Sequence, residues 1–129
     1  MNSILLTRQE LQIMKVIWEM GAASVKNVYA AISKSKPTAY TTVLTIMGIL
    51  ESKGALTHTK SGRAFIYRPV LTKQQATRNH VHDIIDRFFD GNPEKLIANI
   101  RSNNMKEVNA AEQDVRFNVE MRASVPTQK

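Results

Sequence analysis

Threonines are the residues of this chain whose type and spacing best suit a binding chemistry, and they recur between about Thr38 and Lys53. A threonine hydroxyl can hydrogen-bond to a base edge or a phosphate, and its methyl group can contact the methyl group of thymine. The segment has helical periodicity, with Val43, Met47 and Leu50 on the side that we expect to pack inward. The opposite side carries Thr38, Thr42, Thr45 and Ile49, and the predicted DNA-contacting residues of the segment are Thr38, Tyr40, Thr41, Thr42 and Thr45. Because threonine is a poor helix former, an ordinary solvated surface is the less favoured alternative.

A second candidate set is basic and follows along the chain at Lys60, Arg63 and Arg68. Cationic side chains at these positions can contact phosphates or the minor groove, which gives affinity and register but no choice of sequence. Exposed hairpins also carry lysine and arginine to protect their edges, so this set alone leaves both interpretations open. Next to the threonine-bearing helix, it favours DNA.

The distribution of charge supports a polyanionic partner for the first half of the chain. The net charge of the whole chain is +7. Residues 1–71 hold nine basic and three acidic side chains, whereas residues 72–129 hold nine basic and eight acidic side chains. One half is therefore strongly cationic and the other nearly neutral, which is a pattern typical of nucleic-acid binding.

Several functional classes are excluded or disfavoured by composition. The chain has no cysteine, which excludes disulfides, thiolate zinc sites, iron–sulfur clusters and cysteine nucleophiles. His58, His80 and His82 have no accompanying cluster of metal ligands, and no catalytic motif is present, so we expect no metal, no cofactor and no enzyme activity. The start of the chain has neither a basic segment nor a long apolar run, so we expect no secretory signal, no membrane insertion and a cytoplasmic location.

The elements that position the candidate residues follow from local signals. Thr7 and Glu10 form a capping-box pattern that begins a first helix ended by Gly21, and Ser24 caps a second helix. The third helix, from about Thr38 to Lys53, is ended by Gly54. A period-two pattern then predicts two strands, which are joined at Ser61-Gly62-Arg63. Helix, helix, helix and hairpin make up a winged helix-turn-helix, so the expected fold class is mainly α with a small β-hairpin wing.

The remaining residues predict a helical arm. Thr72 and Gln75 form another capping-box pattern, and Asn92 and Pro93 begin a later helix. The apolar residues of the arm are spaced as on helices: Val81, Ile84, Ile85, Phe88, Phe89, Leu96, Ile97 and Ile100. This surface must pack either against its own chain or against a second copy, and dimerisation is the favoured alternative. We therefore expect a DNA-binding domain at 1–71, a dimerisation region at 72–121, which includes a further helix at 105–121, and a disordered tail at 122–129.

Spaced motifs along most of the chain resemble a known family. The residues that carry the resemblance are Leu6-Thr7, Glu10, Met14 and Ile17-Trp18; Ser24-Val25 and Val28; Tyr40-Thr41-Thr42-Val43 and Thr45; Leu50-Glu51 and Lys53-Gly54; Gly62-Arg63, Tyr67 and Pro69; and Phe88-Phe89-Asp90-Gly91 with Leu96. Together they resemble the penicillinase/methicillin-resistance repressor family of bacteria, which also includes copper-responsive repressors.

The resemblance implies a homodimeric winged-helix repressor that binds a palindromic operator in double-stranded DNA, in front of resistance or stress genes. In the best-known members, a membrane sensor protease cleaves the repressor and relieves repression. The corresponding stretch here is Asn99-Ile100, with Ile100 at a position where the family has an aromatic residue. The copper-responsive members use C-terminal cysteines, so their mechanism does not transfer to this chain. Gly48-Ile49 stands where the family usually has a polar or basic pair, so the operator sequence is expected to differ.

Two hypotheses of different classes remain at this stage. The first is sequence-specific repression by a homodimer, relieved by proteolysis or by a ligand. The second is a winged-helix module that assembles with an acidic protein, or a protein that binds DNA without sequence specificity. Substituting Thr42 or Thr45 by alanine distinguishes them, because only the first hypothesis predicts a loss of operator selectivity.

Overall fold

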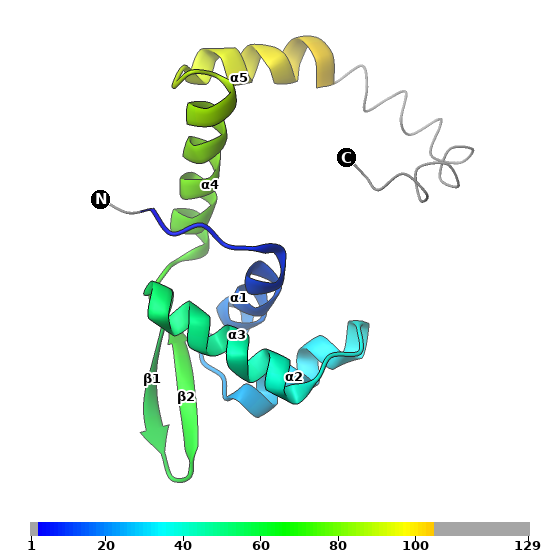
Figure 1. Ribbon diagram of the computed structural model, residues 1–129, viewed down its shortest axis with the longest axis vertical. Helices are drawn as coiled ribbons and strands as arrows, with labels where there is room; N and C mark the ends of the chain where they lie inside the picture. Colours follow the sequence, from blue (N-terminus) through cyan, green and yellow to red (C-terminus); the bar gives the residue numbers. More distant parts are fainter. Residues whose placement is uncertain (1–2, 105–129) are drawn as a thin grey trace, which may run out of the picture. The chain divides into compact units, whose positions relative to one another are not determined.

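The computed structural model, whose helices and strands are labelled in Figure 1, describes residues 3–104. The chain divides into two units, Met1–His82 and Asp83–Lys129. The elements follow the order α1 (Arg8–Met20), α2 (Val25–Ser35), α3 (Tyr40–Lys53), β1 (Leu56–Ser61), β2 (Ala64–Pro69), α4 (Lys73–Phe88), α5 (Pro93–Asn99) and a π-helical turn, η1 (Ile100–Asn104). The two strands form one antiparallel hairpin. The expected mainly helical fold with a hairpin wing is therefore confirmed. The predicted helix at 105–121 and tail at 122–129 lie outside the described residues.

The ends of the first two helices are formed by local hydrogen bonds. The Thr7 hydroxyl accepts from the backbone N–H of Glu10 at 3.2 Å, while the Glu10 carboxylate accepts from the N–H of Thr7 at 2.9 Å. Ser24 and Asn27 form the same reciprocal pair at the start of α2. These bonds satisfy N–H groups that have no partner inside the helix, and they fix where each helix begins.

The first unit has one apolar core beneath three helices and the hairpin. Its largest fully buried side chains come from α1, α2 and α3: Met14, Ile17, Val28, Val43, Met47 and Leu50. The hairpin joins this core through Tyr67, whose backbone pairs with Ala23 by two hydrogen bonds of 2.8 and 3.0 Å. The indole N–H of Trp18 donates to the Leu71 carbonyl at 2.8 Å, which attaches α1 to the segment before α4. The core thus holds α3 along one whole face.

The residues before α1 are held by side chains of both α3 and α4. Lys53 donates to the Leu5 carbonyl at 3.0 Å, and Asn79 donates to the Ile4 carbonyl at 3.0 Å. The backbone N–H of Leu6 donates to the Nε2 atom of His80 at 2.9 Å, so this ring nitrogen acts as an acceptor. Segment Ile4–Leu6 therefore links the C-terminal end of α3 to α4 within the first unit.

A charged pair lies at the edge of the core. Glu10 is the buried acidic residue of the described chain, and its carboxylate lies 2.7 Å from the Lys53 ammonium. Burial is the largest influence on the pKa of Glu10 and raises it, but hydrogen bonds and charge from Lys53, with hydrogen bonds from Thr7, outweigh burial. The pKa of Glu10 therefore lies below its ordinary value of 4.5.

The second unit begins within the last part of α4. Residues Asp90 and Gly91 both have positive φ, 53° and 77°, and the Gly91 N–H donates to the Ile85 carbonyl at 3.0 Å. This reversal of the chain ends α4 in the way that left-handed residues commonly end helices. Asn92 then caps α5 through the N–H of Glu94, with Pro93 at its first position, as expected. No described helix is long and apolar enough to cross a membrane.

Candidate nucleic-acid interface

Helix α3 presents one buried face and one fully exposed face. Val43, Met47 and Leu50 are completely buried, as the periodicity predicted. Its outward residues are Tyr40, Thr41, Leu44, Thr45, Gly48, Ile49, Ser52 and Lys53. At about 3.6 residues per turn, Thr41, Thr45, Gly48 and Ser52 form the centre line of this face, and Leu44 and Ile49 lie on its two sides. Figure 1 shows α3 beside the hairpin and α2, both of which pack against it.

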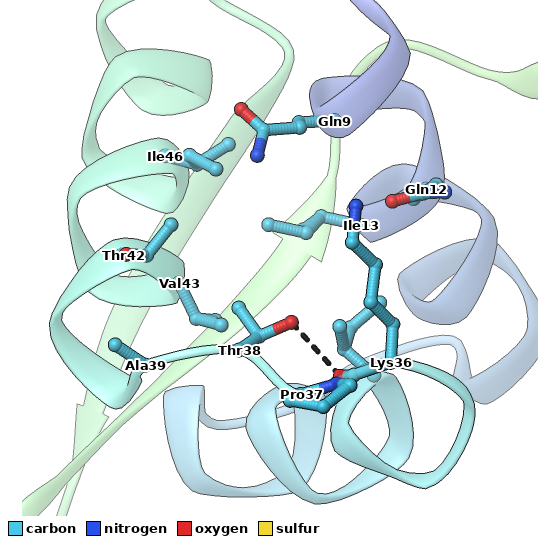
Figure 2. A pocket seen from close by; sticks show the side chains of 11 residues that line it. Gln9, Gln12, Ile13, Lys36, Pro37, Thr38, Ala39, Thr42, Val43 and Ile46 are labelled. Carbon is cyan, nitrogen blue, oxygen red and sulfur yellow. Dashed lines mark hydrogen bonds between the residues drawn. The ribbon is translucent and has the colours of Figure 1, made fainter.

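The start of α3 differs from the expectation in a way that changes the place of Thr38. The helix begins at Tyr40, two residues later than predicted, so Thr38 precedes the helix. The Thr38 hydroxyl instead donates to the Lys36 carbonyl at 3.0 Å. Thr38 and Thr42 are both half-buried, and they line a pocket of about 210 Å³ with residues of α1, including Gln9 and Gln12 (Figure 2). The prediction that Thr38 lies on the outward face of α3 was wrong. Thr42 lies on the same side of α3 as Ile49, two helical turns earlier, and so at the edge of that face.

The first turn of α3 lacks a side-chain cap. Ala39 occupies the capping position and has no side-chain hydrogen bond to give. Tyr40 is 45 % exposed, and its ring meets that of Tyr29 edge to face with the ring centres 5.4 Å apart. The aromatic contact with α2 therefore orients Tyr40 at the end of the exposed face.

The three predicted basic residues of the hairpin do not lie on one face of it. Lys60 pairs with Phe65, whereas Arg68 pairs with Thr57. Because side chains alternate along a strand, Lys60 and Arg68 project from opposite faces of the hairpin. Arg63 is exposed in the turn between the strands. A hydrogen bond of 3.1 Å from Arg68 to the Thr59 hydroxyl agrees with this register.

A short side-chain contact joins the hairpin to α3. The His58 Nδ1 atom of β1 lies 2.7 Å from a Glu51 carboxylate oxygen of α3. The His58 ring also packs against the rings of Phe65 and Tyr67, with ring centres 4.6 and 5.2 Å away. Burial, followed by electrostatic interactions with Glu51 and Tyr40, raises the pKa of Tyr67 above its ordinary value of 10. These contacts hold the hairpin in place beside α3.

Sequence reasoning rejected His58 as a metal ligand and favoured a solvated or partly packed histidine, and it did not identify Glu51 as its partner. The two residues are seven positions apart and belong to different elements, so no local pattern links them. The exposed apolar residues Leu44 and Phe65, which are both 46 % exposed, were also missed. Among residues 3–104, the structure contains no group of three or more side chains able to hold a metal ion.

Comparison with known proteins assigns this fold to a family. Residues 6–115 match the family model described as penicillinase repressor. The chain belongs to the penicillinase repressor family. The resemblance stated from the spaced motifs is therefore confirmed.

Individual relatives of the penicillinase repressor family agree with this assignment. The penicillinase repressor of Bacillus licheniformis is 32% identical over 94 residues, which cover 73% of this chain and 73% of that protein. The solution structure of the DNA-binding domain of the repressor BlaI is 34% identical with a TM-score of 0.51, and the match covers 54% of this chain and 85% of that domain. The solution structure of Bacillus licheniformis BlaI in monomeric form with the blaP half-operator is 32% identical, also with a TM-score of 0.51, and covers 57% and 90%. The names of these relatives describe regulators.

Proposed function

We propose that this chain is a transcriptional repressor that binds a palindromic operator in double-stranded DNA as a homodimer. The observation that carries the proposal is the exposed face of α3 beside a basic hairpin, in a fold that matches BlaI bound to the blaP half-operator at 32% identity. The chain is accordingly a DNA-binding regulator of the penicillinase repressor family and acts in the cytoplasm, where DNA is accessible. Nothing in this role requires a cofactor or enzyme activity.

In this proposal α3 lies in the major groove, where the edges of the base pairs can be distinguished. Tyr40, Thr41 and Thr45 are exposed on α3 and contact base edges. Thr38 and Thr42, which are half-buried next to the pocket, contact the sugar–phosphate backbone at the edge of the same face. The basic residues of the hairpin contact phosphates or the minor groove. They are Lys60 and Arg63 near its tip and Arg68 on the face opposite to Lys60.

Exposed apolar residues of α4, α5 and η1 support the homodimer. Phe88 is 68 % exposed, and Val81, Ile84, Ile97 and Ile100 are between 37 % and 43 % exposed. Ile85, Phe89 and Leu96 complete the predicted dimerisation set and are half-buried. Large exposed apolar side chains in this number mark an interaction surface. A two-fold dimer matches the two half-sites of a palindrome.

Relief of repression follows cleavage of the arm by a membrane sensor protease or binding of a ligand. Asn99 is the last residue of α5 and Ile100 is the first of η1, so the bond between them lies at the junction of two helical turns. Both residues are exposed, which a protease requires of its substrate.

The experiment that tests the proposal is the selection of bound sequences from a random duplex pool, with the mass of the complex measured by light scattering. We expect an enriched palindrome bound by two copies of the chain. The logarithm of the affinity should fall with the logarithm of salt concentration by about 0.9 per neutralised phosphate. Absence of enrichment, or an affinity indifferent to salt, contradicts the proposal.

A further inference from the structure

We propose that α3 identifies the operator half-site mainly through the methyl groups of thymine, with Gly48 as the position where the helix approaches the bases most closely. This inference rests on the proposed function, because it assumes that the exposed face of α3 meets DNA. It adds the identity of the bases and the residues that select them.

The first argument is the set of side chains that α3 exposes. Guanine is read most often by arginine or lysine and adenine by asparagine or glutamine, through pairs of hydrogen bonds. Helix α3, which is described in full, exposes no arginine, asparagine or glutamine. Its one cation, Lys53, bonds the Glu10 carboxylate at 2.7 Å and the Leu5 carbonyl at 3.0 Å, so its ammonium is engaged inside the first unit. Paired hydrogen bonds to purines are therefore not available from this helix.

The second argument is the pair of aliphatic side chains that the helix exposes instead. Leu44 is 46 % exposed and Ile49 is 43 % exposed, although the core beneath α3 is fully packed. They lie on the two sides of the centre line that contains Thr41 and Thr45. The thymine methyl group is the apolar group of the major groove. Contact between it and aliphatic side chains or threonine methyls favours binding, because the contact removes apolar surface from water.

The third argument is Gly48 itself. Glycine is among the least favourable residues inside a helix, and Gly48 has an ordinary helical backbone that any residue can adopt. A Cβ atom placed on Gly48 would meet nothing within 4 Å in the first unit. Packing within the described part of the chain therefore gives no reason for glycine at this position. A glycine is explained if another molecule closely approaches the backbone of α3 at the centre of the exposed face, because glycine has no side chain in the way.

Cations on neighbouring elements indicate that the other molecule is DNA. Lys34 and Lys36 are exposed at the end of α2, and Lys60 and Arg63 are exposed on the hairpin. Helix α3 packs against both α2 and β1. An apolar surface with cations on elements at either side suits a groove whose floor carries methyl groups and whose walls carry phosphates.

The direct test replaces thymines of the selected half-site by deoxyuridine, which removes only the methyl group. We expect the full-length chain to lose affinity by about four-fold for each methyl that is buried. In the Ile49→Ala and Leu44→Ala variants, the same replacements should cost less, because the partner of the methyl is already absent. Val70→Ala removes an exposed aliphatic group outside α3 and the hairpin, and it should behave as the wild type.

The Gly48→Ala variant provides a second test that separates binding from folding. The substitution should raise Tm by about 4–8 °C, because alanine favours the helix. It should also weaken binding to the selected operator by about ten-fold or more, because the added methyl group occupies the position of closest approach. Gln74→Ala, at an exposed position of α4, is the matched control and should leave binding unchanged.

The outcomes distinguish this inference from the proposed function. Specific binding to a selected palindrome that is insensitive to deoxyuridine, or a half-site without thymine, overturns the thymine-methyl inference and leaves the repressor function intact. Unchanged operator affinity in Gly48→Ala overturns the role of Gly48. Failure to enrich any sequence overturns the proposed function and this inference together.

Discussion

Helices α3 and α4 both expose large apolar side chains, but the two helices are held in different ways. Helix α3 buries Val43, Met47 and Leu50 completely, so its exposed face is carried on a fixed support. Helix α4 has 16 residues, of which only Ala76 is buried in the described chain. The first arrangement suits a preorganised surface that recognises a rigid partner such as a duplex. In the second arrangement, the apolar side chains of α4 are exposed within residues 3–104, which suits association with a second copy.

The largest expected effect comes from placing a charge among the exposed apolar side chains of α4. In Phe88→Asp and Ile84→Asp, the dimer should dissociate, because burying an unpaired carboxylate in an apolar interface is strongly unfavourable. Affinity for a two-half-site operator should fall about 100-fold or more, since one half-site contact set is lost. Light scattering and a binding titration measure both effects. Gln74→Asp adds the same charge at an exposed position of α4 outside the apolar set, and it should remain dimeric.

The next prediction tests whether the Lys53–Glu10 pair stabilises the attachment of α3 to the first unit. Lys53→Met removes the ammonium that bonds Glu10 and the Leu5 carbonyl, and it leaves a buried carboxylate without its partner. The free energy of unfolding should fall by about 2 kcal/mol, less than for a fully buried pair because Lys53 is partly exposed. Denaturant unfolding measures this loss. If Lys53→Met unfolds at the same denaturant concentration as the wild type, the pair does not anchor α3.

A smaller effect is expected on the exposed face itself. Thr45→Ala removes a hydroxyl and a methyl group from the centre of the face, and it should reduce discrimination between operator and random DNA by about five-fold. Thr38→Ala should change discrimination less than about two-fold, because the Thr38 hydroxyl already bonds the Lys36 carbonyl. Competition binding compares the two variants. Equal losses in both variants would mean that the whole segment, and not the outward face of α3, selects the sequence.

The smallest effect concerns pH. The folded-state pKa of Glu10 is lowered from 4.5, so its contribution to stability is fully present above that value. The contribution is lost as the pH falls from about 4.5 through the lower folded-state pKa. Unfolding free energies measured between neutral and acidic pH should therefore decline less steeply in Glu10→Gln than in the wild type. If the free energy of unfolding declines equally with falling pH in both proteins, Glu10 does not contribute to the loss of stability in acid.

The structural features that depend on neighbouring residues in the chain were predicted from the sequence. The capping box at Thr7, the helix cap at Ser24, the glycine ends of α1 and α3, and the buried side of α3 all agree with the structure. These features depend on residues within one or two helical turns of each other. Thr38 was assigned to the helix face because the start of the helix was placed two residues too early, whereas its hydroxyl donates to the Lys36 carbonyl ahead of the helix. The half-burial of Thr42 depends on the neighbouring residues of α1, which the periodicity of α3 does not contain.

Contacts between distant residues could not be predicted in this way. Glu10 was recognised as part of a capping box, but its pairing with Lys53 joins residues 43 positions apart. His80 was expected to be a solvated or partly packed histidine and not a metal ligand, but its specific partner, the N–H of Leu6 from 74 positions away, was not predicted. The opposite faces of Lys60 and Arg68 depend on the register of the hairpin, which a shift of one residue would reverse.

The most direct test of the central claim compares the selected palindrome with the same duplex in which one half-site has been scrambled. A homodimer that places one α3 helix on each half-site should bind the scrambled duplex about 100-fold or more weakly, and the intact palindrome with two copies of the chain. Equal affinity for the two duplexes, or one copy of the chain bound to each, would contradict recognition of a palindromic operator by a homodimer.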